Sequence, residues 1–252
     1  MRRVVFFFLF CPIILFAQID ESDTLKVKAG LSLSGFWQRG NVKTSIFRGR
    51  TDFSVIPWKK WVYKNTNSYV YQAFGGDKAD EDFLSLNFLY FNPQRRLYPQ
   101  VLAFLSTNFR RAIDARYLMG AGATYQVLQK EGQMLKISLT TEYEETQFNQ
   151  TGFNRTEYNG KSTIRTIRGT IWINGKYTLF EKRIILTHES YFQPSLEDSR
   201  NYRWRAEVGL ELPIWKFLNF TVNYIDTFES IVIEEQVQGD QFLTFGFSLK
   251  SY

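Results

Sequence analysis

Residues 115–144 alternate between apolar and polar side chains with a period of two. In residues 117–127, apolar or small residues occupy the odd positions, whereas polar residues and glycine occupy every even position except Leu118. The same alternation returns in residues 135–144, after a turn in which Gly132 can adopt the positive φ that tight turns often need. Such alternation indicates a strand, and about ten residues is the length of a tilted strand that crosses a membrane. This stretch therefore predicts a transmembrane β-hairpin.

The pattern recurs along the chain and predicts about twelve strands. They fall at 25–38, a segment ending near 56, 61–74, 83–91, 98–109, the two halves of the hairpin above, 163–173, 183–192, 200–212, a segment around 218–224, and 241–252. Turns near 57–60, 92–97, 129–132, 174–176 and 213–216 are short, whereas loops near 75–82, 146–162 and 229–240 are longer. An even strand number, short periplasmic turns and longer external loops are typical of bacterial barrels. Closure is expected because an open sheet edge in lipid leaves backbone groups unpaired. We therefore predict an all-β fold, a closed antiparallel up-and-down transmembrane β-barrel.

The first seventeen residues have the features of a secretory signal peptide. Arg2 and Arg3 precede an apolar run at 4–16, and Ala17 completes a plausible cleavage site. An anchoring helix is the alternative, but the run is short and contains a proline. The predicted organisation is a signal peptide (1–17), a short periplasmic lead-in (18–24) and a barrel domain (25–252). The chain's single cysteine, Cys11, lies in the signal, so the mature protein has no thiol chemistry.

Composition agrees with a barrel wall. Aromatic residues make up 17% of the chain, yet the mean hydropathy is −0.28, because apolar and polar positions average out. No run after residue 17 approaches the roughly 18 apolar residues of a membrane helix. Aromatic residues at strand ends are predicted to form interfacial girdles: Trp37, Trp58, Trp61, Tyr90, Phe109, Trp215 and Tyr252. The net charge of +6, or +4 without Arg2 and Arg3, is spread over many strands, which argues against nucleic-acid binding.

Several segments, taken in order, resemble a known family. They are GNVKTS, DARYLMGAGATYQVL, PSLEDSRNYRWRAEVGLELPI, LNFTVNY and the closing FGFSLKSY. Together they resemble the YdiY-like, salt-induced outer-membrane protein family, a domain of unknown function. The resemblance covers nearly the whole mature chain and implies an outer-membrane β-barrel. It implies no catalytic or ligand residues.

Charged residues at the alternate strand positions that are predicted to face the barrel interior are the strongest candidates for function. The candidate lumen charges are Arg48, Arg50, Asp52, Arg116, Lys136, Glu142, Glu144, Arg168, Arg203, Arg205, Glu207 and Glu211. A charge facing lipid at the bilayer midplane costs about 2–4 kcal/mol, which favours their inward placement. They could line a channel with a mild anion preference, or pair into a network that fills the barrel. The mixture of signs favours pairing.

Candidates for catalysis and metal binding are weaker. His188, the only histidine, shares a strand face with Ser190, but no nucleophile-elbow pattern is present. One histidine and no mature cysteine exclude a usual zinc site. The carboxylates in 77–82 lack a full calcium-loop spacing, so a solvated loop facing divalent-bridged lipopolysaccharide is the better interpretation.

The sequence thus predicts location better than biochemical role. We expect a protein of the Gram-negative cell outer membrane with a structural or envelope-stress role, a charged and largely filled lumen, no enzymatic activity and no cofactor. A small-solute, anion-leaning porin is the alternative, and an outer-membrane lipid hydrolase is a distant one. A soluble periplasmic β protein is the structural alternative. Expected partners are outer-membrane lipid, lipopolysaccharide and the barrel-assembly machinery, with small solutes in the porin alternative and no nucleic acid.

Overall fold

A computed structural model describes residues 27–39, 43–181, 183–215 and 218–249. The predicted signal peptide, the lead-in at 18–24 and Tyr252 lie outside the described residues. Among the described residues, no helix has the length and apolar character needed to cross a bilayer.

The structure is a single antiparallel sheet of twelve strands in chain order. The strands are β1 (Val27–Gln38), β2 (Thr44–Trp58), β3 (Trp61–Phe74), β4 (Asp77–Phe91), β5 (Leu97–Asn108), β6 (Ile113–Lys130), β7 (Gln133–Phe148), β8 (Thr163–Leu179), β9 (Ile184–Pro194), β10 (Tyr202–Trp215), β11 (Leu218–Glu229) and β12 (Gly239–Leu249). One short 3-10 helix, η1 (Thr156–Tyr158), lies between β7 and β8. The predicted all-β, up-and-down arrangement of twelve strands is confirmed.

The strand boundaries correct the sequence prediction at several places. Residues 77–82, predicted to be a loop, belong to β4 and pair with β3, and Gly75 and Gly76 form the turn with φ values of 67° and 110°. Residues 174–176 were predicted as a turn, yet β8 continues to Leu179. The predicted turns at 213–216 and 57–60 are shortened because β10 reaches Trp215 and β2 reaches Trp58. In each case backbone pairing with a neighbouring strand outweighs local turn residues such as glycine and proline.

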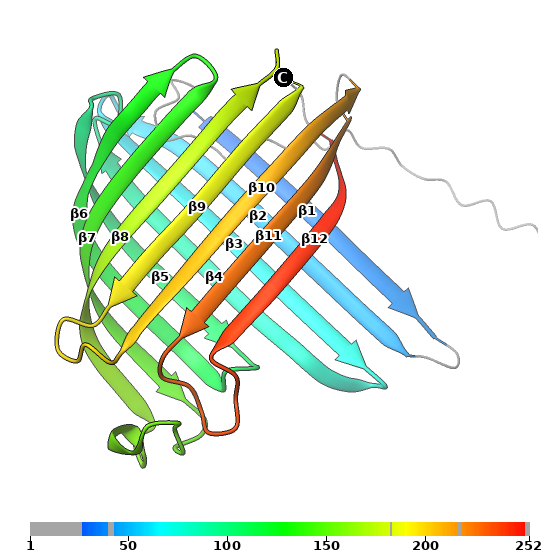
Figure 1. Ribbon diagram of the computed structural model, residues 1–252, viewed down its shortest axis with the longest axis vertical. Coiled ribbons are helices and arrows are strands. Elements are labelled where there is room, and N and C mark those ends of the chain that lie inside the picture. The colour runs from blue at the N-terminus through cyan, green and yellow to red at the C-terminus, as the bar shows by residue number, and fades with distance from the viewer. Residues whose placement is uncertain (1–26, 40–42, 182, 216–217, 250–252) are drawn as a thin grey trace, which may run out of the picture.

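The sheet curls, so its two faces are distinct. Figure 1 shows β8–β12 in front of β1–β5, with the two groups of strands crossing. Side chains from strands that are not neighbours meet on the concave side: Arg116 of β6 lies 2.9 Å from Glu229 of β11. The rings of Phe104 (β5) and Trp172 (β8) are 6.1 Å apart. We call this concave side the inner face. Closure into a barrel, which needs β1 to pair with β12, stays a prediction.

Side chains on β6 and β7 alternate as the sequence predicts. Met119 and Leu139 of the outer face are 66% and 59% exposed, whereas Lys136 and Glu142 of the inner face are 2% and 1% exposed. Tyr90 departs from its predicted place in an interfacial girdle. It lies on the inner face, 6% exposed, because β4 turns its apolar side inward.

The three longest connections, residues 149–162, 195–201 and 230–238, all lie at one end of the sheet. The connections β3–β4, β5–β6, β7–β8, β9–β10 and β11–β12 gather at the lower end of Figure 1, together with η1. This arrangement places the candidate site, because the longer loops pack over the strands that carry the buried charges.

Candidate functional site: a buried charge network beneath packed loops

Glu144 of β7 is the centre of a charge network on the inner face. Its side chain is 2% exposed and accepts hydrogen bonds from two arginines. Arg168 of β8 donates from Nε at 2.9 Å and from Nη2 at 3.0 Å. Arg203 of β10 donates from Nη2 at 2.5 Å. A buried carboxylate needs such paired, hydrogen-bonded cations, since an isolated buried charge is very costly.

Arg116 extends the network across the interior to β11. Its Nη1 and Nη2 donate to the two carboxylate oxygens of Glu229, each at 2.9 Å. Its Nε lies 4.0 Å from Glu144 Oε1. A bidentate arginine–carboxylate pair fixes both position and orientation. Arg116 therefore connects the β6–β7 part of the wall to β11.

Neutral side chains complete the hydrogen bonding of these charges. Gln193 of β9 accepts from Arg203 Nε at 2.5 Å and donates to Thr170 at 2.7 Å. Thr170 in turn donates to Glu142 at 2.7 Å, and Thr140 also donates to Glu142. We call the set Arg116, Glu142, Glu144, Arg168, Thr170, Gln193, Arg203 and Glu229 the Glu144 network. It joins side chains from six consecutive strands, β6 to β11.

Gly120 on β6 provides the space that Glu142 occupies. A Cβ at Gly120 would lie 2.6 Å from Glu142 Cγ and 2.2 Å from the backbone oxygen of Thr141. Any larger residue would therefore collide with the neighbouring strand. The glycines that interrupt the polar face of β6 in the sequence are needed for this close approach.

The remaining candidate charges lie apart from the Glu144 network. Arg50 pairs with Asp52 at 2.8 Å, with side chains 52% and 24% exposed. Arg205 pairs with Glu207 at 2.8 Å, with side chains 34% and 33% exposed. Arg50 of β2 also interacts electrostatically with Glu207 of β10 and Glu189 of β9, so these pairs face each other across the interior. The other three candidates are placed as follows: Arg48 exposed, Lys136 buried and Glu211 half-buried.

Three members of the Glu144 network, Thr170, Gln193 and Glu229, are not among the predicted site residues. The prediction places Glu229 and Gln193 in loops, whereas Glu229 ends β11 and Gln193 lies within β9. Both residues follow an inner-face residue at a spacing of two: Glu229 follows Thr227 on β11, and Gln193 follows Tyr191 on β9. Extending the two predicted strands by this alternation could have found them.

Two loops pack together at the end of the sheet nearest the network. Phe153 in the β7–β8 loop forms an isolated bridge with Ile233 in the β11–β12 loop. Asn154 donates its backbone N–H to the Val232 oxygen at 3.0 Å, and its side chain accepts from Val232 N–H at 3.1 Å. The shared apolar cluster comprises Ala112, Ile113, Phe148, Phe153, Tyr158, Ile164, Ile231 and Ile233. We call residues 149–162 and 230–238 the loop cap. Its segment 230–238 begins directly after Glu229 of the network.

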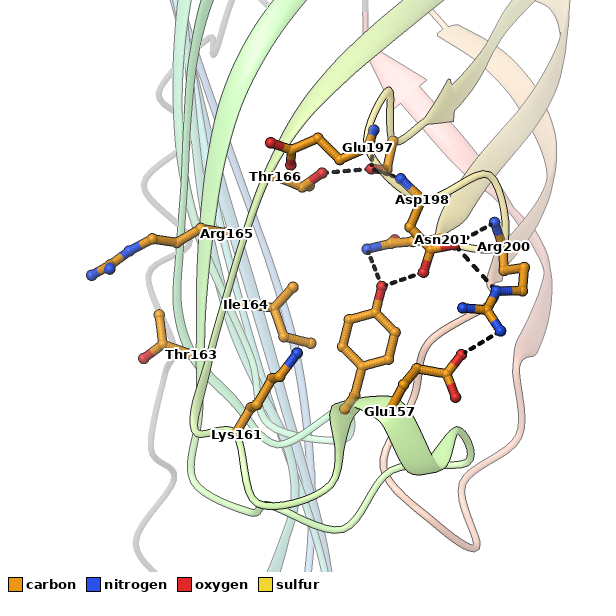
Figure 2. A pocket seen from close by; sticks show the side chains of 12 residues that line it. Glu157, Lys161, Thr163, Ile164, Arg165, Thr166, Glu197, Asp198, Arg200 and Asn201 are labelled. Carbon is orange, nitrogen blue, oxygen red and sulfur yellow. Dashed lines mark hydrogen bonds and ion pairs between the residues drawn. The ribbon is translucent and has the colours of Figure 1, made fainter.

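A cavity of about 580 Å³ lies beside η1, between the β7–β8 and β9–β10 loops. Tyr158 lines it and donates a hydrogen bond to Asp198 at 2.8 Å. Arg200 pairs with Glu157 at 2.9 Å (Figure 2). Arg165 is directed away from these side chains in Figure 2. The hydrogen bond from Tyr158 holds the pKa of the Asp198 carboxyl below its usual value, and Arg200 contributes in the same direction. The contacts of Tyr158 with Asp198 and of Glu157 with Arg200 therefore connect the loop cap to the β9–β10 loop.

The weaker candidates find other partners. His188 lies on the outer face, its ring stacked on Tyr177 with centroids 5.8 Å apart. The carboxylates predicted as a possible calcium loop are separately engaged: Asp80 with Arg110 at 3.3 Å and Glu81 with Lys78 at 2.9 Å. Among the described residues, no group of three or more histidine, cysteine, aspartate or glutamate side chains is placed to hold a metal ion.

Comparisons with known proteins point to one family and one fold. A family model described as protein of unknown function, DUF481, matches residues 31–250. The NanC porin, solved in a rhombohedral crystal form, aligns with a TM-score of 0.51 at 10% identity, covering 89% of this chain and 98% of the porin. The translocator domain of autotransporter NalP from Neisseria meningitidis aligns with a TM-score of 0.43 at 12% identity, covering 89% and 87%. No curated protein sequence matches. At this low identity the porin alignment shows a shared fold alone.

Proposed function

The chain belongs to the DUF481 family of proteins of unknown function, and we propose that it is an outer-membrane β-barrel with a structural role in the envelope. In this proposal β1 pairs with β12 to close the barrel, and the interior beneath the loop cap is filled. The observation that carries it is the Glu144 network, in which Glu144 and Arg168 are both almost fully buried and paired.

The outer surface of β6–β8 supports membrane insertion. Met119, Leu139, Tyr143 and Ile171 face outward and are 66%, 59%, 49% and 46% exposed. Exposed apolar side chains in such a row are expected where lipid, rather than water, covers the wall. External loops of such barrels are longer than periplasmic turns, so in this proposal the loop cap lies on the external side, in contact with lipopolysaccharide. The same proposal includes export by residues 1–17 and insertion by the barrel-assembly machinery.

A filled interior follows from the energetics of the network. Removing one partner of a buried ion pair typically costs about 3–5 kcal/mol, so the paired state is strongly preferred once formed. Opposite charges in direct contact also neutralise one another, and they present no ring of a single sign to a passing ion. The network thus connects β6 to β11 from within and narrows the interior below the loop cap.

Single-channel conductance in a planar bilayer tests this proposal. The refolded mature chain, whose folding is checked by heat-modifiable gel migration, should show no steady current steps. A variant without residues 150–160 should also stay silent, because the Glu144 network lies beneath the cap. Steady, salt-dependent steps from the wild-type protein would contradict the filled interior.

A small-solute porin with a mild anion preference is the second candidate. It is favoured by the exposed Arg48 and by the half-exposed pairs Arg50–Asp52 and Arg205–Glu207, which face the interior away from Glu144. If this candidate is correct, wild-type protein conducts and Arg205→Glu lowers its anion preference. Arg165→Glu, on the outer face, is the matched control and should leave selectivity unchanged.

The proposal includes no catalytic activity and no cofactor. The His188 ring stacks on Tyr177 on the outer face, and this placement favours a packing role. Lipid hydrolysis by purified protein that is abolished by His188→Ala would contradict this part.

A further inference from the structure

The outer face of β2–β4 carries a row of neutral polar side chains that extends over three neighbouring strands. The row consists of Thr51 on β2, Asn65 and Asn67 on β3, and Ser85 and Asn87 on β4. Their placement follows from the register, because their neighbours Asp52, Thr66 and Leu86 pair on the inner face. We call these five residues the amide ladder.

The ladder is continuous through hydrogen bonds. Asn67 donates to Asn65 at 2.6 Å and to the Thr51 hydroxyl at 3.2 Å. Asn65 donates to Asn87 at 2.8 Å, and Asn87 donates to the Ser85 hydroxyl at 3.2 Å. The hydroxyls of Thr51 and Ser85 therefore end the ladder as acceptors. Within the described residues neither hydroxyl donates a hydrogen bond, so each end has a donor to offer.

The ladder lies near mid-height of the wall. Its members are four to seven residues from the ends of β2, β3 and β4 at the short-turn side. A strand tilted by about 40° gains about 2.5 Å of height per residue, which places the ladder about 10–18 Å into an apolar band about 25 Å tall. On β7, the apolar Leu139 lies at a comparable position, six residues from the short-turn end of its strand, and is 59% exposed. Lipid tails cannot hydrogen-bond, so polar groups at this depth are better covered by protein.

We propose that the amide ladder is the contact surface for a second copy of this chain in the membrane. This inference rests on the proposed function, because it requires the outer face to be covered by lipid. Asparagine, serine and threonine side chains both donate and accept, so the ladder is complementary to itself. A two-fold axis along the membrane normal brings two copies together with their ladders at the same depth, and such isologous contacts are the commonest in homo-oligomers.

Aromatic rings on both sides of the ladder suit the same contact. Phe47 and Tyr69 lie 6.2 Å apart on one side, and Phe53 and Tyr63 lie 6.5 Å apart on the other. Tyr63 also donates its hydroxyl to Asn87 at 2.7 Å, which fixes its ring against the ladder. Rigid aromatic side chains around a polar centre contribute contact area with little loss of side-chain freedom. The ladder itself carries no charge that a second copy would repel.

Cysteine cross-linking in the outer membrane tests the proposal, because the mature chain beyond the predicted signal contains no cysteine. Thr51→Cys places a thiol in the exposed end of the ladder. Thr141→Cys is the matched control: Thr141 is also exposed on the outer face, on β7. After membrane-permeant oxidation, Thr51→Cys should give a covalent dimer of twice the chain's mass, several-fold more than Thr141→Cys. Equal yields, or a band of another mass, would overturn the proposal.

The second measurement is the mass of the purified protein in mild detergent. Wild-type protein should be a dimer, Asn65→Leu/Asn67→Leu should be monomeric, and Thr141→Leu should remain dimeric. A monomeric wild type would overturn the proposal. Membrane fractionation and heat-modifiable migration of the same samples distinguish failure of the dimer inference from failure of the proposed barrel function. A barrel that inserts without dimerising refutes only the dimer inference.

Discussion

Strands β7 and β4 belong to one sheet, yet they present opposite chemistry to its two faces. β7 has apolar residues such as Leu139 outside and the charged Glu142 and Glu144 inside, each 1% exposed. β4 has apolar residues inside, where Phe88 stacks on Tyr90 with centroids 5.7 Å apart, and it has Asn87 outside. The same backbone pairing supports both arrangements, because alternation fixes only that neighbouring residues face opposite sides.

The difference teaches that the interior is built in two ways. Around β7 it is held by paired charges, which are specific in geometry but costly to bury. Around β4 it is held by aromatic contacts that extend from Phe88 to Phe104 at 5.2 Å and on to Trp172 at 6.1 Å. The contrast also predicts different neighbours outside: lipid beside β7, and protein beside β4.

Removing the central carboxylate of the Glu144 network should reduce the stability of the protein the most. Glu144→Gln leaves Arg168 and Arg203 without their carboxylate, and we expect unfolding to become easier by about 3–5 kcal/mol. The measurement is the urea midpoint of heat-modifiable gel migration in refolded protein. Glu131→Gln, an exposed carboxylate in the β6–β7 turn, is the control and should leave the midpoint unchanged. Equal midpoints for both variants would show that the Glu144 network contributes no stability.

Removing an aromatic ring from the interior beside β4 should reduce stability by a smaller amount. Phe88→Ala removes the ring between Tyr90 and Phe104, and because Phe88 is only partly buried the loss should stay below the roughly 3–5 kcal/mol of a fully buried phenylalanine. The same urea midpoint measures it. Leu89→Ala, one residue away on the outer face, is the control, since lipid can fill the space that it leaves. A larger loss than that of Glu144→Gln would reverse our ranking of the two sides.

The smallest change in stability is expected at the loop cap. One of its two segments, residues 149–162, directly follows β7. Tyr158→Phe removes the hydrogen bond that lowers the pKa of Asp198. A lowered carboxyl pKa contributes stability above the ordinary carboxyl pKa, and that contribution is lost as pH falls through the lowered value. Protease cleavage within 149–162 of wild-type protein should therefore rise in acid, whereas Tyr158→Phe should already be cleaved faster at neutral pH and change less. Tyr143→Phe, on the outer face, is the control, and parallel pH profiles for all three proteins would contradict the role of Asp198.

The sequence by itself determined the strand number, the antiparallel order and the faces of β6 and β7. These features follow from a strict period of two, which is a local property of the chain. It also identified five charged members of the Glu144 network, because their parity opposes that of the apolar residues. It did not identify Gln193 and Glu229, which lie beyond the predicted ends of their strands.

Only the tertiary structure decided which charges meet. Glu144 and Arg203 are 59 residues apart in the chain, and Arg116 and Glu229 are 113 apart, so their contact depends on how far the sheet curls. The reversed faces of β4 were likewise undecided, because residues 83–91 are apolar on both parities except at Ser85 and Asn87. Pairing with β3 and β5 selected the face, since register along a whole ladder of hydrogen bonds outweighs the preference of any single side chain.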